Sequence, residues 1–211
     1  AWATTYLVRP AGNDQADGKT PATALKTLSR AAELLNHGDS IVLAPGTYRG
    51  SVLIAERFGT EAVRILITGD ESGQQTGEPA GPVVLDSGLS DQPALHLSRL
   101  KHVTLSNLTF KSPMPGLKIE SSRDVIVQRC TFDSSSRGLI IEGSHGTRVE
   151  SSVFYRCLIG LFVKNSVDTR LTHLTVGGST AARALQKWRE IADGPNFSCR
   201  LRWKTGEWFR N

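Results

Sequence analysis

The hydrophobic positions between residues 94 and 181 repeat every 22 residues. Four blocks of this length follow one another without an insertion, and the first begins at Ala94. Within each block apolar and polar residues alternate, as in LKIE at residues 117–120. Alternation of this kind is typical of a β-strand with one buried and one exposed face. A fixed period over consecutive blocks indicates a repeat architecture, in which each block is one unit of a stack.

Apolar residues occupy the same columns in every block. A single block cannot bury these residues, whereas stacked blocks place equivalent residues over one another at the ~4.8 Å spacing of β-strands. Full burial of each large column residue stabilises the fold by ~1.5–3 kcal/mol. The columns are Leu95, Leu117, Leu139 and Leu161; Leu97, Ile119, Ile141 and Val163; Leu105, Val127, Val149 and Leu171; and Phe110, Phe132, Phe154 and Val176. The pattern therefore predicts an all-β coil of parallel strands.

Each block contains three short strand-like runs, for example 117–119, 125–127 and 130–132. Ser, Asp, Arg and Gly residues separate the runs, which is the chemistry of turns. A glycine opens three of the four blocks, where a tight corner needs a residue without a Cβ. The period excludes a solenoid of hexapeptide repeats. The runs are too short and too rich in β-branched residues for a helical solenoid.

The first third of the chain fits the same plan less regularly. Residues 39–54 are predicted to form two strands around a Pro-Gly turn, and 62–68 and 82–86 are predicted strands of the next coil. The intervening stretch 69–81 is rich in Gly, Pro and polar residues, and it is predicted to project as a loop. Such a loop can bind a ligand, although most projecting loops are plain surface.

Residues 21–36 are predicted to form a helix. Thr20 and Pro21 mark its start, Gly38 marks its end, and apolar side chains recur on one face. Those side chains are Leu25, Leu28, Ala32 and Leu35. The end of a stack of coils exposes unpaired strand edges and an apolar core, which solenoids cover with a capping element. We therefore expect this helix to cap the N-terminal end.

The repeat pattern ends abruptly near Ala182. Residues 181–211 contain three of the four Trp residues, and seven Lys and Arg against three Asp and Glu. Two interpretations are open. The tail is a C-terminal cap, with an amphipathic segment at 181–192 and a Trp-rich plug, or it is the product of a frameshift or truncation that replaced further repeats. We expect the β-helix domain to span residues 4–180, with regular coils at 94–181.

The charge of the chain is uneven. The net charge of the 211 residues is +5, yet residues 1–180 hold 18 Lys and Arg against 17 Asp and Glu. Proteins that read nucleic acid usually carry a basic stripe on their folded face, so nucleic acid is not an expected partner. No apolar run approaches the ~20 residues of a membrane-spanning helix, so no membrane span is predicted.

The three cysteines form an odd set without CxxC spacing, which argues against a metal centre or a disulfide framework built on them. Cys130 shares a column with Leu108 and Leu174 and is predicted to be a core residue. The chain begins with AWA, the small-x-small form that precedes a signal cleavage site. This favours an extracellular or periplasmic location, and an arbitrary chain boundary is the alternative.

The N-terminal part resembles the start of right-handed parallel β-helix proteins of the pectate lyase-like superfamily. The stretch concerned is YLVRPAGNDQADGKTPATALKTLSRAAELLNHGDSIVLAPGTYRG. The shared motifs are Gly12-Asn13-Asp14, Asp17-Gly18, Gly38-Asp39 and Pro45-Gly46-Thr47-Tyr48. The resemblance covers residues 4–178. It implies a right-handed single-stranded parallel β-helix, with three short strands per 22-residue coil and an N-terminal capping helix.

The superfamily includes polyuronide lyases, polygalacturonases, sugar epimerases and catalytically silent members. Its lyases use a Lys or Arg as base, with acidic residues holding calcium against the uronate carboxylate. Its hydrolases use clustered aspartates. Both kinds of site lie on the outer face of stacked strands. The resemblance therefore implies an acidic polysaccharide as partner and calcium as a possible cofactor.

The outward columns of the first strand in each block supply the candidate site. They are His96, Lys118, Ile140 and Phe162, and Ser98, Glu120, Glu142 and Lys164. By the resemblance, Lys118 is the expected base, and Glu120 and Glu142 are expected to hold calcium or to position a carboxylate. The expected substrate-binding residues are His96, Glu120, Glu142, Phe162 and Lys164.

Other interpretations of these residues are open. The columns can form a solvent-exposed ladder of opposite charges, worth little per pair, with Phe162 packed under a loop instead of stacking on a sugar. A hydrolase would rest on Asp124 and Asp168, two coils apart with Gly146 between them. Two coils span ~10 Å, which is too far for a retaining pair of carboxylates and at the limit for an inverting pair.

Two functions are therefore expected alternatives. One is calcium-assisted β-elimination on an acidic polysaccharide, and the other is a non-catalytic carbohydrate-binding or scaffold role. A basic residue that converges with acids in a groove favours the enzyme, and a flat charged face favours the binding protein. A fragment of a larger polysaccharide-degrading enzyme is a further interpretation. The chain is expected to be a monomer.

Overall fold

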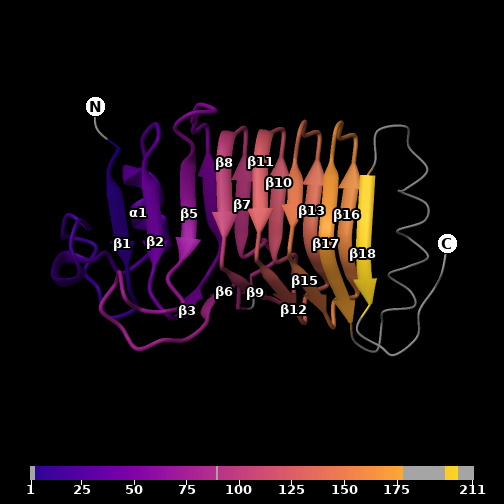
Figure 1. Cartoon of the computed structure of the whole chain (residues 1–211). Coiled ribbons are helices and arrows are strands. Elements are labelled where there is room, and N and C mark those ends of the chain that lie inside the picture. The colour runs from indigo at the N-terminus through magenta and orange to yellow at the C-terminus, as the bar shows by residue number, and fades with distance from the viewer. Residues whose placement is uncertain (1–2, 89, 178–197, 204–211) are drawn as a thin grey trace.

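The protein is a parallel β-helix whose coils stack in chain order along one axis (Figure 1). The computed structural model describes residues 3–88, 90–177 and 198–203. The predicted all-β coil of parallel strands is confirmed, because every strand pairing within these ranges is parallel.

One face of the coil is a sheet that has five strands in the described part of the chain. These strands are the first run of each predicted block, preceded by one strand from the less regular region. They are β4 (Val52–Ala55), β7 (Leu95–Ser98), β10 (Leu117–Glu120), β13 (Arg137–Glu142) and β16 (Ile159–Lys164).

A second sheet, with 13 strands among the described residues, forms the other two sides. One side contains β1 (Thr5–Val8), β2 (Ser40–Leu43), β5 (Ile65–Gly69), β8 (Lys101–Ser106), β11 (Arg123–Gln128) and β14 (Arg148–Glu150). The other contains β3 (Gly46–Arg49), β6 (Val83–Asp86), β9 (Thr109–Lys111), β12 (Thr131–Asp133) and β15 (Val153–Tyr155). Strand β17 (Arg170–Gly177) joins the two sides, because it pairs with both β14 and β15.

The predicted columns are the core. Leu117 pairs in register with Leu95 and Leu139, which is the 22-residue offset of the sequence repeat. The Phe110 and Phe132 rings stack with centroids 5.0 Å apart, and the Phe132 and Phe154 rings stack with centroids 4.7 Å apart. All three rings are at most 1% exposed. Cys130 is buried as predicted, and burial raises the pKa of its thiol to about 12.

The less regular N-terminal region contains one more strand than the sequence predicted. Residues 39–54 were expected to form two strands, but the segment contains β2, β3 and most of β4. The stretch 69–81 is a loop as expected, apart from Gly69 at the end of β5. Its buried Asp70 carboxylate accepts hydrogen bonds from Ser72, Gln75 and Thr76, so the loop is ordered from within.

The predicted helix over 21–36 is wrong in its extent. A 3-10 turn covers Pro21–Thr23, and the α-helix α1 covers only Leu28–Leu34. The chain between them is extended, because Leu25 exchanges backbone hydrogen bonds with Leu7 and Arg9. The Asp14 carboxylate also accepts bonds from the backbone nitrogens of residues 26 and 27, which holds this segment out of the helix. Helix α1 still packs against β1, β2 and β4, as a cap requires.

Most of the tail at 181–211 lies outside the described residues, including the predicted amphipathic segment at 181–192. The exception is β18 (Ser198–Trp203), which pairs in parallel with β17 and adds a strand to the stack. Arg170 of β17 pairs with residue 198 and Leu174 with residue 201, so the offset is 28 residues before a register shift and 27 after it, and β18 does not continue the 22-residue repeat. The choice between a native cap and a replaced repeat stays a prediction.

Candidate functional site

The predicted site residues lie together on the outer face of the five-stranded sheet. We call His96, Lys118, Glu120, Glu142, Phe162 and Lys164 the ladder face. The strands hold them in register: Lys118 lies beside His96 on β7, and Glu120 lies beside Glu142 on β13. Phe162 and Lys164 follow on β16, beside Ile140 and Glu142. The outward columns were therefore placed correctly from the sequence.

Lys118 is at the centre of the charges on the ladder face. Its ammonium donates to Glu120 Oε1 at 2.5 Å and lies 3.5 Å from Glu142 Oε2. Glu120 Oε2 is 3.1 Å from His96 Nε2, and Glu142 Oε1 is 3.5 Å from Lys164 Nζ. An imidazole or ammonium group therefore alternates with carboxylates across four adjacent strands.

These contacts fix the protonation of the central pair. The hydrogen bond with Glu120 is the main reason that the pKa of Lys118 is raised above its ordinary value. The same bond is the main reason that the pKa of Glu120 is lowered. At neutral pH the pair is an ammonium and a carboxylate. A general base has to be unprotonated, and enzymes obtain such lysines by lowering their pKa. The pKa of Lys118 is instead raised.

Phe162 is partly covered by a neighbouring cation. The Arg137 guanidinium carbon lies 5.6 Å from the centroid of the Phe162 ring, which is a cation–π distance. Ile140, between Lys118 and Phe162 on the face, is 7% exposed. The apolar part of the ladder face is thus a small platform next to the alternating charges.

A second polar cluster lies where the chain turns from the ladder face into β11, β14 and β17. Asp124 and Asp168, with Gly146 between them, were considered in the sequence only as a hydrolase pair, and the basic residues around them were not assigned. The cluster lines a hollow of about 320 Å³. We call it the corner hollow; its residues are His102, Arg123, Asp124, His145, Gly146, Arg148, Asp168 and Arg170. It is contiguous in sequence with the ladder face, because Glu120 precedes Arg123 by three residues.

The floor of the corner hollow is a turn position that recurs in each coil. His102, Asp124, Gly146 and Asp168 are 22 residues apart, and all have positive φ, between 51° and 69°. Asp tolerates this left-handed conformation better than most residues. Gly146 is the member without a side chain, so a gap is left between Asp124 and Asp168.

Asp124 is held by three cationic or potentially cationic groups. Its carboxylate accepts hydrogen bonds from Arg64 at 2.5 Å, His102 at 2.6 Å and Arg148 at 2.8 Å. Burial alone would raise the pKa of Asp124, but the bonds from Arg64, His102 and Arg148 outweigh it and lower the pKa well below the ordinary range. Asp124 is therefore an ionised structural carboxylate. It cannot donate a proton as the acid of a glycosidase does.

The contact of Arg64 with Asp124 was not predicted from the sequence. This arginine precedes the regular repeat and lies 60 residues from Asp124 in the chain, so no periodic pattern connects them. The basic residues of the hollow are visible as a pattern in the sequence, since Arg148 and Arg170 are 22 residues apart and therefore adjacent in register.

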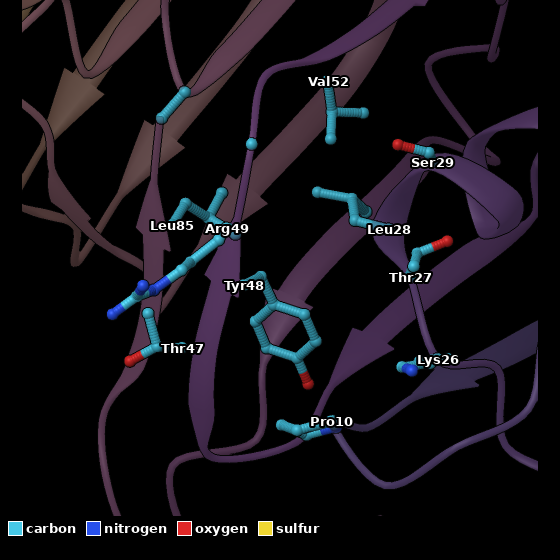
Figure 2. Close-up of a pocket in the computed structure, with 12 residues that line it drawn as sticks. Pro10, Lys26, Thr27, Leu28, Ser29, Thr47, Tyr48, Arg49, Val52 and Leu85 are labelled. Atoms are coloured by element: carbon cyan, nitrogen blue, oxygen red, sulfur yellow. The ribbon is translucent and has the colours of Figure 1, made fainter. Parts of the chain in front are cut away.

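The concave region between the cap and the first coils holds none of the predicted site residues. A pocket of about 250 Å³ lies between α1 and strands β3 and β4. Figure 2 shows the Tyr48 side chain on the pocket side of its strand, with the hydroxyl pointing towards Pro10, and Thr47 and Arg49 on the other side of the strand. The Tyr48 hydroxyl donates to the backbone oxygens of Val8 and Ala44. Tyr48 thereby ties β3 to β1, which is a structural role.

The described residues do not fit a metal centre. Among them no group of three or more His, Cys, Asp and Glu side chains is placed to hold an ion. Calcium takes six to eight oxygen ligands, whereas the Glu120 oxygens already bind Lys118 and His96. Copper favours thiolate and imidazole ligands, whereas Cys130 is buried and protonated. The predicted calcium at Glu120 and Glu142 therefore stays a prediction.

Solved structures with the same architecture are carbohydrate-active proteins. Pectate lyase Pel9A superposes with a TM-score of 0.61 at 18% identity, covering 83% of this chain and 48% of that chain. A glycosyl hydrolase candidate from Parabacteroides merdae gives 0.56 at 11% identity, covering 95% of this chain and 98% of that one. A GH136 lacto-N-biosidase from Eubacterium ramulus gives 0.54 at 11% identity, covering 94% and 50%.

Identities this low show the fold alone. The protein is a parallel β-helix of the pectate lyase-like type, and the resemblance found in its sequence is confirmed. The chain spans about half the length of the pectate lyase it matches, 48% of that chain. A search of curated proteins finds no match to the sequence.

The sequence of the chain places it in a family. The family described as periplasmic copper-binding protein (NosD) matches residues 65–190, more than half of the chain. The chain belongs to the NosD family. The periplasmic description confirms the predicted extracellular or periplasmic location. Within the described residues, no helix has the length and apolar character needed to cross a membrane.

Proposed function

We propose that this chain binds an acidic polysaccharide along the ladder face and does not cleave it. The observation that carries the proposal is the state of Lys118, whose ammonium is held between the carboxylates of Glu120 and Glu142. A lysine in this arrangement is a fixed positive charge, suited to holding an acidic sugar and unsuited to removing a proton from it.

The cations of the ladder face support an acidic ligand. Lys118 and Lys164 balance the negative charges of Glu120 and Glu142, and Arg137, which lies over the Phe162 ring beside the ladder face, adds one positive charge. Lys164 has a side chain 55% exposed, so it is available to a carboxylate of the ligand. The Phe162 ring provides an apolar surface on which a sugar ring can pack. The open face of a stacked sheet suits a polymer that crosses several coils.

Calcium-assisted β-elimination is the second candidate. It is supported by the convergence of Lys118 with Glu120 and Glu142, and by the fold shared with a pectate lyase. Under this alternative Lys118 is the base, and calcium bound by Glu120 and Glu142 holds the uronate. Calcium would have to displace the Lys118 ammonium from Glu120, which would also free the lysine from the bond that raises its pKa.

Equilibrium binding to polygalacturonate, alginate and neutral dextran tests the proposal. The acidic polymers should bind, dextran should not, and binding should weaken as salt screens the charges. The double variant Lys164→Gln, Arg137→Gln should weaken binding several-fold, since each change removes an exposed cation of the face.

The matched control is the double variant Lys111→Gln, Arg129→Gln, which also removes two exposed positive charges, both outside the five-stranded sheet. It should bind like the wild type, apart from a small general effect of net charge. Equal binding of dextran and polygalacturonate would refute the proposal. So would equal weakening by the control and by the ladder-face variant.

A further inference from the structure

The corner hollow is a concave site with an excess of positive charge. Three arginines line it, at the first residues of strands β11, β14 and β17: Arg123, Arg148 and Arg170. Asp124 and Asp168 are its two carboxylates. Arg64, from the turn before β5, also binds Asp124, although it does not line the hollow.

Asp124 does not compete for a ligand in the hollow. Its two oxygens are taken by Arg64, His102 and Arg148, and its side chain is 21% exposed. Asp168 meets Arg170 at 3.2 Å, where both side chains are well exposed, 43% and 60%. Exposed pairs of this kind are weak, so Arg170 can exchange Asp168 for another anion at little cost.

Arg123 is the cation of the hollow with no ion pair within the described residues. It is exposed, and it starts β11 in register with Lys101 of the preceding coil. The isolated bridge between Arg123 and His145 places an imidazole beside it on the next coil. Planar guanidinium groups bind carboxylate and sulfate through two parallel hydrogen bonds, which makes arginine the preferred residue for such groups.

We propose that the corner hollow is a subsite for one carboxylate or sulfate group of an acidic polysaccharide. The group occupies the gap over Gly146, with Arg123 on one side and Arg170 on the other. This subsite rests on the proposed function, and it extends the ladder face around the corner of the coil. A polymer lying on the ladder face reaches the hollow through the three-residue turn after Glu120.

Gly146→Asp is a sharp test, because the fold already accepts aspartate at this turn position. Asp124 and Asp168 adopt φ of 51° and 54° in the same column, and Gly146 has φ of 69°. A Cβ at Gly146 comes no closer than 3.8 Å to any atom beyond its neighbours in the chain, which is an ordinary contact. The variant should therefore fold, and its carboxylate fills the hollow and repels an anion.

Gly77→Asp is the matched control. Gly77 has a φ of 74°, is exposed, and lies in the loop at 69–81, which contributes no residue to the ladder face or to the corner hollow. The nearest atom to an added Cβ is Pro21 Cβ at 3.6 Å. The two variants carry the same change of charge and side chain in the same backbone conformation, and only one of them fills the hollow.

The measurement is titration of each protein with a galacturonate oligosaccharide, and with inorganic sulfate as a competitor. Gly146→Asp should weaken oligosaccharide binding about tenfold or more, the loss expected when a charge-assisted contact is replaced by repulsion. Gly77→Asp should bind within about twofold of the wild type. Sulfate should compete with the oligosaccharide for binding to the wild type. It should not compete for binding to Gly146→Asp.

The outcomes separate the two proposals. If the wild type and Gly146→Asp bind the oligosaccharide equally, the subsite is refuted while the proposed function stands. If sulfate binds in the hollow but the oligosaccharide does not compete with it, the hollow is an inorganic anion site and the sugar subsite is refuted. If no acidic sugar binds the wild type at all, the proposed function is refuted, and the subsite that rests on it is refuted as well.

Discussion

At the scale of single residues, the glycines that open three of the repeat blocks show why these positions need a residue without a side chain. The sequence predicted that Gly116, Gly138 and Gly160 serve a tight corner. The structure gives a different reason, because none of the three has a positive φ. A Cβ at Gly138 would lie 2.6 Å from the Gly160 backbone oxygen and 2.9 Å from Phe154 Cδ1. The glycine is needed because the next coil and the phenylalanine stack approach so closely.

The alanine variants of this column should differ in stability. Gly138→Ala should lower the free energy of unfolding by about 1–3 kcal/mol, since the backbone oxygen it meets cannot move aside without shifting a coil. Gly160→Ala should cost well under about 1 kcal/mol, because its nearest contacts are 3.4–3.6 Å from Phe154. Denaturant unfolding of the two variants measures the difference. Equal losses would contradict the close-approach explanation.

At the scale of elements, the sequence repeat predicted the contacts between neighbouring coils. It did not predict the contacts between segments that are far apart in the chain. The ladder face was predicted because its residues recur with the strand and coil periods. The length of α1 was not predicted. The Asp14 carboxylate accepts hydrogen bonds from the backbone nitrogens of residues 26 and 27, and Asp14 lies outside the local helical pattern. The Arg64–Asp124 contact was missed for the same reason, since it joins β11 to the turn before β5.

The Asp124 network should make the protein sensitive to acid. The pKa of Asp124 is lowered in the folded state, so its stabilisation is present above the unfolded pKa, near 3.8, and is lost as the pH falls below it. Asp124→Asn should lower the free energy of unfolding at neutral pH by about 1–3 kcal/mol, because Arg64 and Arg148 lose a charged acceptor.

Unfolding measured between neutral pH and pH about 3 checks this expectation. The Asp124→Asn protein should show a flatter decline of stability in acid than the wild type. Asp91→Asn, at an exposed position, should match the wild type in both respects. A variant that is as stable as the wild type at neutral pH, with the same acid profile, would show that the network contributes nothing.

At the scale of the whole molecule, the stacking of the coils places residues that recur in the sequence side by side on one surface. Each coil adds one row to the ladder face and one turn to the corner hollow, so the charges of successive coils lie ~4.8 Å apart. A polymer with regularly spaced carboxylates can contact several rows at once. The fold is shared with carbohydrate-active enzymes, but the protonation of Lys118 is set by its own neighbours, and the proposal that the chain holds a polymer without cleaving it rests on that protonation.

An ultraviolet assay for unsaturated uronide tests this separation most directly. The folded protein is incubated with pectate, alginate and glycosaminoglycans, with calcium or with a chelator, and the same sample is shown to bind the acidic polymers. The account predicts binding without any unsaturated product in either condition. A signal that requires calcium and disappears in Lys118→Ala would contradict it, and would establish Lys118 as the base of a lyase.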